Sequence, residues 1–253
     1  MPFVDMPSAE TPALTTCPIL HRDRFIVIVN KPAGVLSHPN TARSTEQAAF
    51  EGRYDLESKC FDGPGGKVWL IHRLDQDTSG VLLAALDEKT AERCRDLFEE
   101  DAVHKQYLAL VRGQPGASGT WLDHLTTSRE KGRVRTTVLK GRPPNAELDF
   151  QTLAYHAGDR LSLLNIDLIT GKTHQIRVQA ASRQHHLIGD DVYGHFELNR
   201  KLKRELGVKR LFLHAHKLTL QHPASGQRLS VEAPLAADLT TTLGRLGLAL
   251  PAA

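Results

Sequence analysis

The segment at positions 72–80 reads HRLDQDTSG and places charged and hydroxyl side chains directly before a continuous apolar run, VLLAAL. Such a run predicts a buried strand, and polar loop residues held by a rigid scaffold are frequent at functional sites. The same residues could instead form a turn in which Asp75 and Thr78 bond backbone amides. The pattern therefore predicts a buried strand after a polar loop and leaves open, at this point, what the polar groups do.

Asp75 is the candidate reactive group of this loop. A carboxylate with a cation beside it is ionised at neutral pH, so it can act as a nucleophile or base but not as a general acid. The candidate cation is Arg177, in the segment TGKTHQIRV at 170–178. On a helix capped by Thr173, Arg177 would lie beside the apolar stripe and point partly inward. The alternative is an exposed arginine whose stem covers the helix surface.

Short apolar runs separated by Gly and Pro turns predict a mixed sheet with few helices. No internal repeat or Pro/Ser linker divides the chain, so we expect one α+β domain over 19–250, preceded by a flexible leader over 1–18. The predicted strands are 24–30, 81–86, 106–111, 160–169, 211–220 and 228–233, and the predicted helices are 89–101, capped by Asp87, and 173–183. Residues 114–147 have no such pattern and are expected to be looser.

Composition excludes several protein classes. Apolar residues make up 40% of the 253 and charged residues 24%, as in an ordinary folded protein. The three cysteines have no CxxC spacing, which argues against a disulfide framework or a thiolate zinc site and fits a reducing compartment. No stretch approaches the ~18 apolar residues of a membrane span, and the N-terminus lacks the basic and apolar regions of a secretory signal. We therefore expect a cytoplasmic protein with no membrane partner.

Two clusters of basic residues stand out against a net charge of only +3. Charged runs usually form solvated faces, but two of them in a nearly neutral chain weaken that interpretation. The first cluster, at 129–142, contains Arg129, Lys131, Arg133, Arg135, Lys140 and Arg142 against Glu130 alone. The second, at 200–210, contains Arg200, Lys201, Lys203, Arg204, Lys209 and Arg210 against Glu205.

The loop HRLDQDTSG resembles the signature HRLDxxTSG of the RluA-type pseudouridine synthase family. Five further segments resemble family motifs in the family's order: NKPAG at 30–34, KQYLALVRG at 105–113, TGKTHQIRV at 170–178, IGDDVYG at 188–194 and RLFLHA at 210–215. Together they span roughly residues 19–235. The resemblance implies an α+β catalytic domain with a mixed, mostly antiparallel bent sheet, flanked by helices and loops, and an active-site cleft between two halves.

The resemblance also implies roles for individual residues. Asp75 matches the catalytic aspartate, which attacks the sugar or abstracts a sugar proton, and the sequence does not choose between these. Tyr107 matches the tyrosine that stacks on the target base, and Arg177 matches the arginine that pairs with the aspartate. These three are the predicted catalytic residues.

Substrate contacts follow from the same comparison. Arg73 matches the arginine that fills the space left when a base is flipped out of its stack, and Leu213 lies in a strand expected to pack near that base. His72 and Thr78 belong to the same loop as Asp75 and are predicted to bind substrate. Arg133 and Arg135, in the first basic cluster, are predicted to contact phosphates.

The implied reaction isomerises a uridine of a structured RNA, such as a tRNA or rRNA stem-loop, to pseudouridine. The N1–C1′ bond breaks, the base turns, and C5 bonds to C1′, so no group donor or redox change is needed. We therefore expect no cofactor and no metal ion, and a monomer acting on RNA. Lys172 and Gln179 depart from the usual family residues, and we expect neither to affect the chemistry. No S4-like RNA-binding pattern precedes the catalytic motifs, which leaves the choice of RNA open.

Two other functions compete with this interpretation. A non-catalytic RNA-binding protein with the same fold would have no need of a carboxylate facing an anionic partner, so the presence of Asp75, Tyr107 and Arg177 argues against it. A nucleoside hydrolase using Asp75 as its nucleophile would usually pair it with a second carboxylate. Release of free uracil from RNA would favour the hydrolase.

The basic cluster at 129–142 makes binding depend on salt. Replacing both Arg133 and Arg135 by Gln should reduce the slope of log K against log salt by about 0.7 per lost single-strand phosphate contact, with little change in which uridine is modified. Filter binding over a salt series, with pseudouridine mapping, measures both quantities. A loss of site choice at an unchanged slope would contradict the assignment.

Overall fold

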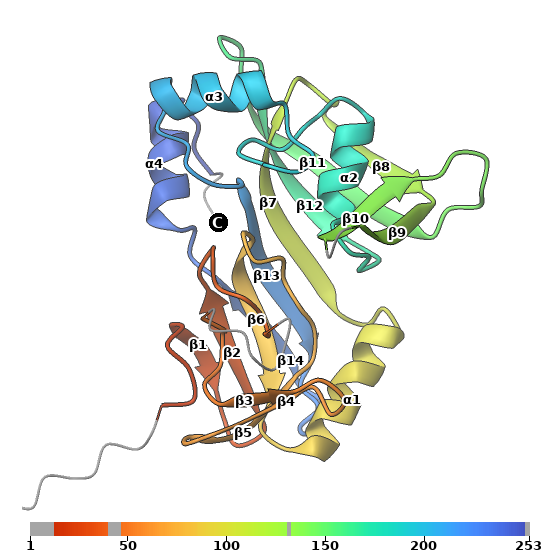
Figure 1. The fold of residues 1–253 in the computed structure, drawn as a ribbon, viewed down its shortest axis with the longest axis vertical. Coiled ribbons are helices and arrows are strands. Elements are labelled where there is room, and N and C mark those ends of the chain that lie inside the picture. Colours follow the sequence, from red (N-terminus) through yellow and green to blue (C-terminus); the bar gives the residue numbers. More distant parts are fainter. Residues whose placement is uncertain (1–12, 40–46, 131–132, 251–253) are drawn as a thin grey trace, which may run out of the picture.

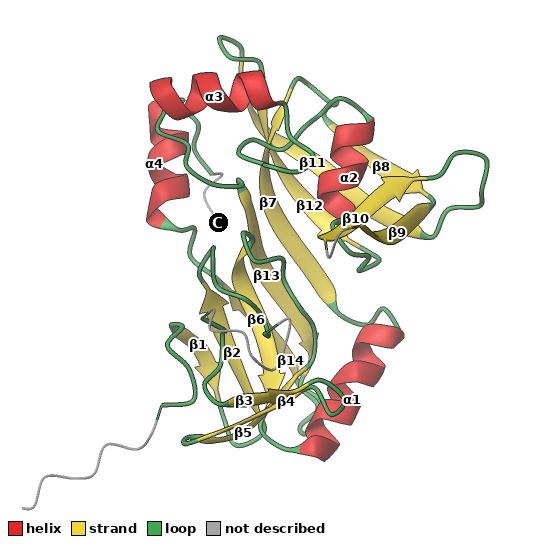
Figure 2. Ribbon diagram, viewed as in Figure 1, coloured by secondary structure: helices red, strands yellow, loops and turns green. Residues whose placement is uncertain are grey.

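The computed structural model describes residues 13–39, 47–130 and 133–250, and in these ranges the chain forms fourteen strands and four helices (Figures 1 and 2). The strands are β1 (Ile19–Arg22), β2 (Ile26–Lys31), β3 (Arg53–Asp55), β4 (Cys60–Gly63), β5 (Gly66–Leu70), β6 (Ser79–Ala85), β7 (His104–Arg112), β8 (Ser118–Asp123), β9 (Leu125–Glu130), β10 (Arg133–Val138), β11 (Ala146–His156), β12 (Leu161–Leu168), β13 (Leu213–Gln221) and β14 (Arg228–Glu232). The helices are α1 (Glu88–Glu99), α2 (Gln175–Ser182), α3 (Phe196–Glu205) and α4 (Ala237–Arg245).

Twelve strands form one sheet whose main path runs β3-β4-β5-β6-β13-β7-β12-β11-β8. Strands β1 and β2 extend it beside β6, and β14 pairs with β13, while β9 and β10 form a separate hairpin. The contact between β6 and β13 is parallel and the other pairs are antiparallel. The predicted fold class, a mixed and mostly antiparallel sheet with flanking helices, is therefore confirmed. Figure 1 shows the sheet running the length of the molecule, with β7 and β13 passing from one half to the other.

The parallel contact between β6 and β13 is only two residues long. Ser79 pairs with His214, and Gly80 pairs with Ala215. Gly80 has φ of +115°, and a Cβ there would lie 2.1 Å from the backbone oxygen of Ala215. The last glycine of HRLDQDTSG is needed because both the backbone angle and the approach of β13 exclude a side chain.

The apolar run after this loop is buried on both faces of the sheet. Leu82 and Ala84 pack in one core cluster, and Val81 and Leu83 pack in another on the opposite face. Successive side chains of a strand point to opposite sides, so a strand covered on both sides has no polar positions. The run VLLAAL therefore predicted β6 correctly.

The first predicted helix is confirmed with its cap. Asp87 accepts a hydrogen bond from the backbone N–H of Thr90 at 2.8 Å, as an N-cap residue does. Ala91 and Cys94 of α1 are fully buried, so Cys94 fills the core.

The expectation of a loose segment over 114–147 is wrong. It contains β8, the β9–β10 hairpin and the start of β11, whose Thr, Ser and Arg side chains are largely exposed and so show little apolar alternation. Helix α3 was also missed. Leu198, Leu202 and the C-cap residue Leu206 are spaced four residues apart, but the basic residues between them obscure this apolar pattern. The three leucines pack with residues of β12 and α4 in a third core cluster.

The start of the domain differs from the expected boundary at residue 19. Residues 1–12 of the expected leader lie outside the described residues, but Leu14 and Cys17 are buried in the core. The backbone N–H of Asn30 also bonds the carbonyl of Pro18 at 2.8 Å. Packed structure therefore begins before β1. Among the described residues, no helix is long and apolar enough to span a membrane.

The strand contact at Gly80 predicts a large effect of a single methyl group. Gly80→Ala should lower the free energy of unfolding by about 3 kcal/mol or more, since strain and overlap add. Gly226→Ala is the matched control: its φ is +70°, but a Cβ there meets nothing within 4 Å, so we expect a loss of about 1 kcal/mol. Urea unfolding measures both, and equal losses would refute the explanation.

Candidate active site

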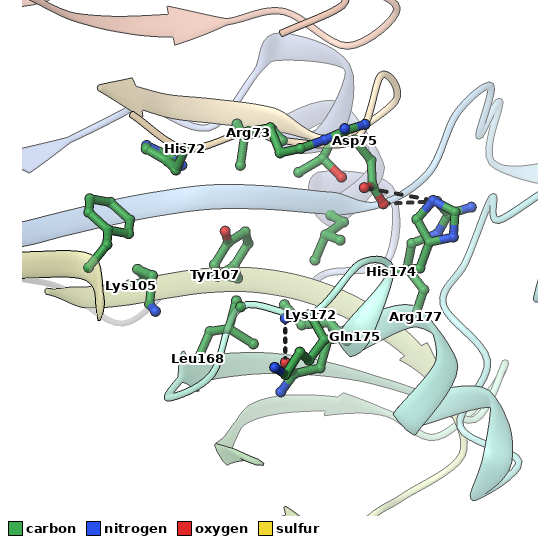
Figure 3. A pocket seen from close by; sticks show the side chains of 16 residues that line it. His72, Arg73, Asp75, Lys105, Tyr107, Leu168, Lys172, His174, Gln175 and Arg177 are labelled. Atoms are coloured by element: carbon green, nitrogen blue, oxygen red, sulfur yellow. Dashed lines mark hydrogen bonds and ion pairs between the residues drawn. The ribbon is translucent and has the colours of Figure 1, made fainter. Parts of the chain in front are cut away.

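A pocket of about 240 Å³ opens between the loop 72–78, strand β7 and the segment leading into α2 (Figure 3). Seven residues predicted from sequence to act on or bind substrate line this one pocket: His72, Arg73, Asp75, Thr78, Tyr107, Arg177 and Leu213. They come from four parts of the chain, because the loop precedes β6, Tyr107 is on β7, Arg177 is on α2 and Leu213 begins β13.

Arg177 joins two carboxylates. Its Nη1 donates to Oδ2 of Asp75 at 2.9 Å, and its Nε and Nη2 donate to the two oxygens of Asp190 at 2.7 and 2.9 Å. The side chain of Asp190 is 1% exposed and that of Asp75 is 21% exposed. The buried carboxylate of Asp190 therefore fixes the guanidinium through two hydrogen bonds. Arg177 donates one further hydrogen bond to Asp75, the carboxylate that faces the pocket.

Asp190 is itself held by the backbone. The N–H groups of Val192 and Tyr193 donate to its Oδ1 at 2.8 and 2.9 Å. Burial acts to raise the pKa of Asp190, but the hydrogen bonds and the charge of Arg177 outweigh it, so the pKa lies below its usual value. The motif IGDDVYG was recognised in the sequence, but the pairing of its first aspartate with Arg177 was not predicted, because nothing in the spacing indicates it.

Helix α2 brings Arg177 inward, but it does not begin as predicted. Its N-cap is His174, with φ of +54° and no side-chain capping bond, so the prediction that Thr173 caps the helix is wrong. Gln175 instead fixes the preceding turn, since its Oε1 accepts from Thr170 Oγ1 at 2.8 Å and from the N–H of Lys172 at 3.0 Å. This turn aims the first residues of α2 at Asp75.

Tyr107 lies across the pocket from Arg177 and is 8% exposed. Burial, together with the negative charge of Asp75, raises the pKa of its hydroxyl above the usual value, so the phenol is neutral at physiological pH. No hydrogen bond joins this hydroxyl to another described residue. Tyr107 therefore lines the pocket with an uncharged aromatic ring.

The pocket is bordered by cations. Arg73 is exposed and has no ion pair within the described part of the chain. Lys105 and Lys172 also line the pocket and were not predicted to do so. Lys172, which was expected not to affect the chemistry, is one of the residues that line the pocket.

A buried lysine supports the loop from behind. The ammonium group of Lys31, which is fully buried, donates to the carbonyls of Pro32, Val35 and Gln76 at 2.9, 2.7 and 3.0 Å. Burial lowers its pKa to about 8. The lysine of the NKPAG segment therefore ties the turn at 32–35 to the loop that carries Asp75.

The other polar side chains of the loop mainly contact the protein itself. Nε2 of His72 accepts from the N–H of Leu83 at 3.0 Å, and burial lowers the pKa of His72 to about 3, so its ring is neutral. Thr78 is buried at the pocket wall. Ser79 Oγ lies 2.9 Å from Nδ1 of His214, but both residues are buried and away from the pocket.

Of the two arginines predicted to contact phosphates, Arg135 does not line this pocket. Arg135 is exposed on β10. Arg133 begins the same strand, and its side chain lies outside what the structure describes. Among the described residues, no group of three or more His, Cys, Asp or Glu side chains could hold a metal ion.

The sequence is similar to a family model and to several known proteins. Residues 25–182 match the family model described as RNA pseudouridylate synthase. The ribosomal large subunit pseudouridine synthase C of Yersinia pestis is 34% identical over 228 residues, covering 88% of this chain and 67% of that protein. The uncharacterised RNA pseudouridine synthase YhcT of Bacillus subtilis is 33% identical over 242 residues, covering 94% and 76%.

Solved structures agree at the level of the fold. Human RNA pseudouridylate synthase domain containing 4 superposes with a TM-score of 0.68 at 24% identity, covering 92% of this chain and 94% of that one. Human RNA pseudouridylate synthase domain containing 1 has a TM-score of 0.65 at 25% identity, covering 92% and 90%.

The buried anchor of Arg177 can be tested by stability. Asp190→Asn removes a carboxylate from a buried pair and should cost about 3–5 kcal/mol. The matched control is Asp238→Asn, because Asp238 also accepts two bonds from one arginine, Arg210, but is 54% exposed. We expect the control to cost up to about 1 kcal/mol. Equal losses in urea unfolding would show that Asp190 is not a buried anchor.

Proposed function

This chain belongs to the RNA pseudouridylate synthase family, and on that basis we propose that Asp75 is the group that isomerises a uridine of ribosomal RNA to pseudouridine in the pocket beside Tyr107. The observation that carries the proposal is the position of Asp75. Its carboxylate faces the pocket, it accepts a hydrogen bond from Arg177 at 2.9 Å, and the ring of Tyr107 lies across the same space.

The chemistry requires a carboxylate near the ribose. Cleaving the N1–C1′ bond leaves C1′ electron-poor, and Asp75 either bonds to C1′ or removes a proton from the neighbouring sugar carbon and later returns it. The base then turns and C5 bonds to C1′. The hydrogen on C5 leaves as a proton and N1 gains one, so product and substrate have the same composition. Both routes use a carboxylate that is held in place while one of its oxygens reaches the sugar.

The other pocket residues suit a flipped nucleotide. Taking a base out of its stack costs a few kcal/mol, and stacking on an aromatic ring recovers about 1–3 kcal/mol per base. The buried, neutral ring of Tyr107 can hold a uracil while its glycosidic bond is open. Arg73 is exposed and unpaired among the described residues, so its guanidinium is free to occupy the space that the base leaves.

Ribosomal RNA is the proposed substrate because several of the curated relatives are named as synthases of the large ribosomal subunit. The charge of the pocket border supports an RNA substrate. Arg73, Lys105 and Lys172 line the pocket, and Arg129 on β9 and Arg135 on β10 are exposed basic side chains. Such contacts position a phosphate backbone, and the choice of uridine depends on the shape of the folded RNA.

Asp75→Asn should abolish pseudouridine formation while binding RNA at least as tightly as the wild type, since it removes a negative charge from the site. Asp77→Asn is the matched control, because Asp77 is in the same loop but is exposed and outside the pocket lining. It should keep activity within about twofold. The assay is tritium release from RNA labelled at C5 of uridine, with filter binding for affinity.

Other outcomes would replace the proposal. Activity in Asp75→Asn would remove Asp75 from the mechanism. RNA binding by the wild type with no tritium release from any ribosomal or transfer RNA would favour a non-catalytic binding protein. Free uracil in the wild-type reaction would indicate a hydrolase.

A further inference from the structure

His174 lies between the catalytic loop and a tyrosine from another part of the chain. Its Nε2 is 3.8 Å from Oδ1 of Asp75, the oxygen that Arg177 does not touch. Its Nδ1 is 2.9 Å from the hydroxyl oxygen of Tyr193. Figure 3 shows His174 and Arg177 approaching the Asp75 carboxylate together.

The hydrogen bonds assign the proton on His174. The Tyr193 hydroxyl oxygen accepts from the backbone N–H of Thr136 at 2.9 Å, and its own hydrogen needs an acceptor. We assign this role to Nδ1 of His174, which lies 2.9 Å away, and this assignment places the proton of the neutral ring on Nε2. Burial lowers the pKa of His174, which favours the neutral ring. The N–H of Nε2 therefore faces Asp75.

The backbone of His174 is strained in a way that serves this orientation. It has a φ of +54° and forms no side-chain cap for α2, although the first N–H groups of a helix usually receive one. A non-glycine residue in this region is strained, and such strain persists at sites where surrounding contacts require it. The turn places the ring toward Asp75 and Tyr193 instead of over the helix end.

We propose that His174 is a positioning residue for the isomerisation: its Nε2–H restrains Oδ1 of Asp75 while Arg177 holds Oδ2, and Tyr193 orients the His174 ring. The proposal rests on Asp75 being the catalytic group. A distance of 3.8 Å is too long for a hydrogen bond, and catalytic bonds that are long in the free enzyme often shorten when substrate binds. With both oxygens held, the carboxylate cannot rotate away from the sugar.

Tyr193 extends this restraint to the β9–β10 hairpin. Its ring packs under the guanidinium of Arg177, with a centroid distance of 5.2 Å, and its hydroxyl joins Thr136 on β10 to His174. The hairpin is separate from the main sheet and carries the exposed Arg129 and Arg135. Tyr193 therefore links the hairpin to the His174 ring beside Asp75.

The test uses variants that remove single atoms. Tyr193→Phe keeps the ring beside Arg177 and removes the hydroxyl, which is also the acceptor for the backbone N–H of Thr136, so urea unfolding is used to check that the variant is folded. We expect its single-turnover rate of pseudouridine formation to fall about tenfold, as for the loss of one hydrogen bond in a buried site, with the Kd for RNA unchanged within twofold. Tyr155→Phe, on the half-exposed surface of β11, is the control and should behave as the wild type.

Variants of His174 separate its two nitrogens. His174→Gln can place an N–H near Asp75, whereas His174→Asn can only replace Nδ1, so the Gln variant should retain several-fold more activity than the Asn variant. In the His174→Ala background, Tyr193→Phe should have no further effect, because Tyr193 acts through His174.

Three results would overturn the proposal: a wild-type rate in Tyr193→Phe, losses that add in the double variant, or losses that appear only as weaker RNA binding. Failure of the proposed function gives a different result, namely activity in Asp75→Asn. If Asp75→Asn is inactive but the Tyr193 and His174 variants have wild-type rates, only the positioning role is rejected.

Discussion

The buried guanidinium of Arg177 is the interaction on which the pocket depends. A charged group in the interior is tolerated only when its donors are paired, and Asp190 supplies two acceptors from a position fixed by backbone N–H groups. One further donor then faces Asp75. Removing either carboxylate changes the balance of charge around a guanidinium whose side chain is only 7% exposed, so the same hydrogen bonds support the fold and the site.

Supporting contacts reach the loop that carries Asp75 from several directions. Lys31 bonds the carbonyl of Gln76 from β2, and Ser37 Oγ donates to the carbonyl of Leu74 at 2.9 Å. On the far side, Gly80 lets β13 approach closely enough to pair with β6. The loop is thus held at both ends and along its backbone, while the side chains of Arg73 and Asp75 remain directed toward the pocket. A rigid loop of this kind orients reacting groups before substrate arrives.

Prediction from sequence succeeded where a local pattern carried the information. The run after the loop predicted a strand buried on both faces, and Asp87 predicted the start of α1. It failed for α3, whose leucines are spaced four apart within a basic stretch, and for β8 to β10, whose side chains are mostly exposed. The predicted N-cap Thr173 was also wrong. The turn before α2 is set by the hydrogen bonds of Gln175 and by the strained backbone of His174, which residue propensities do not indicate.

The sequence by itself determined the family, the candidate reactive carboxylate and its pairing with Arg177, because six motifs in order identify residues whose roles are tied to their chemistry. Only the tertiary structure shows that Asp190 binds Arg177, that Lys31 supports the loop, and that His174 lies between Asp75 and the Tyr193 hydroxyl. These contacts join segments that are far apart along the chain, with no periodic spacing between them. Their geometry exists only once β6, β7, β13 and α2 have packed together around a single pocket.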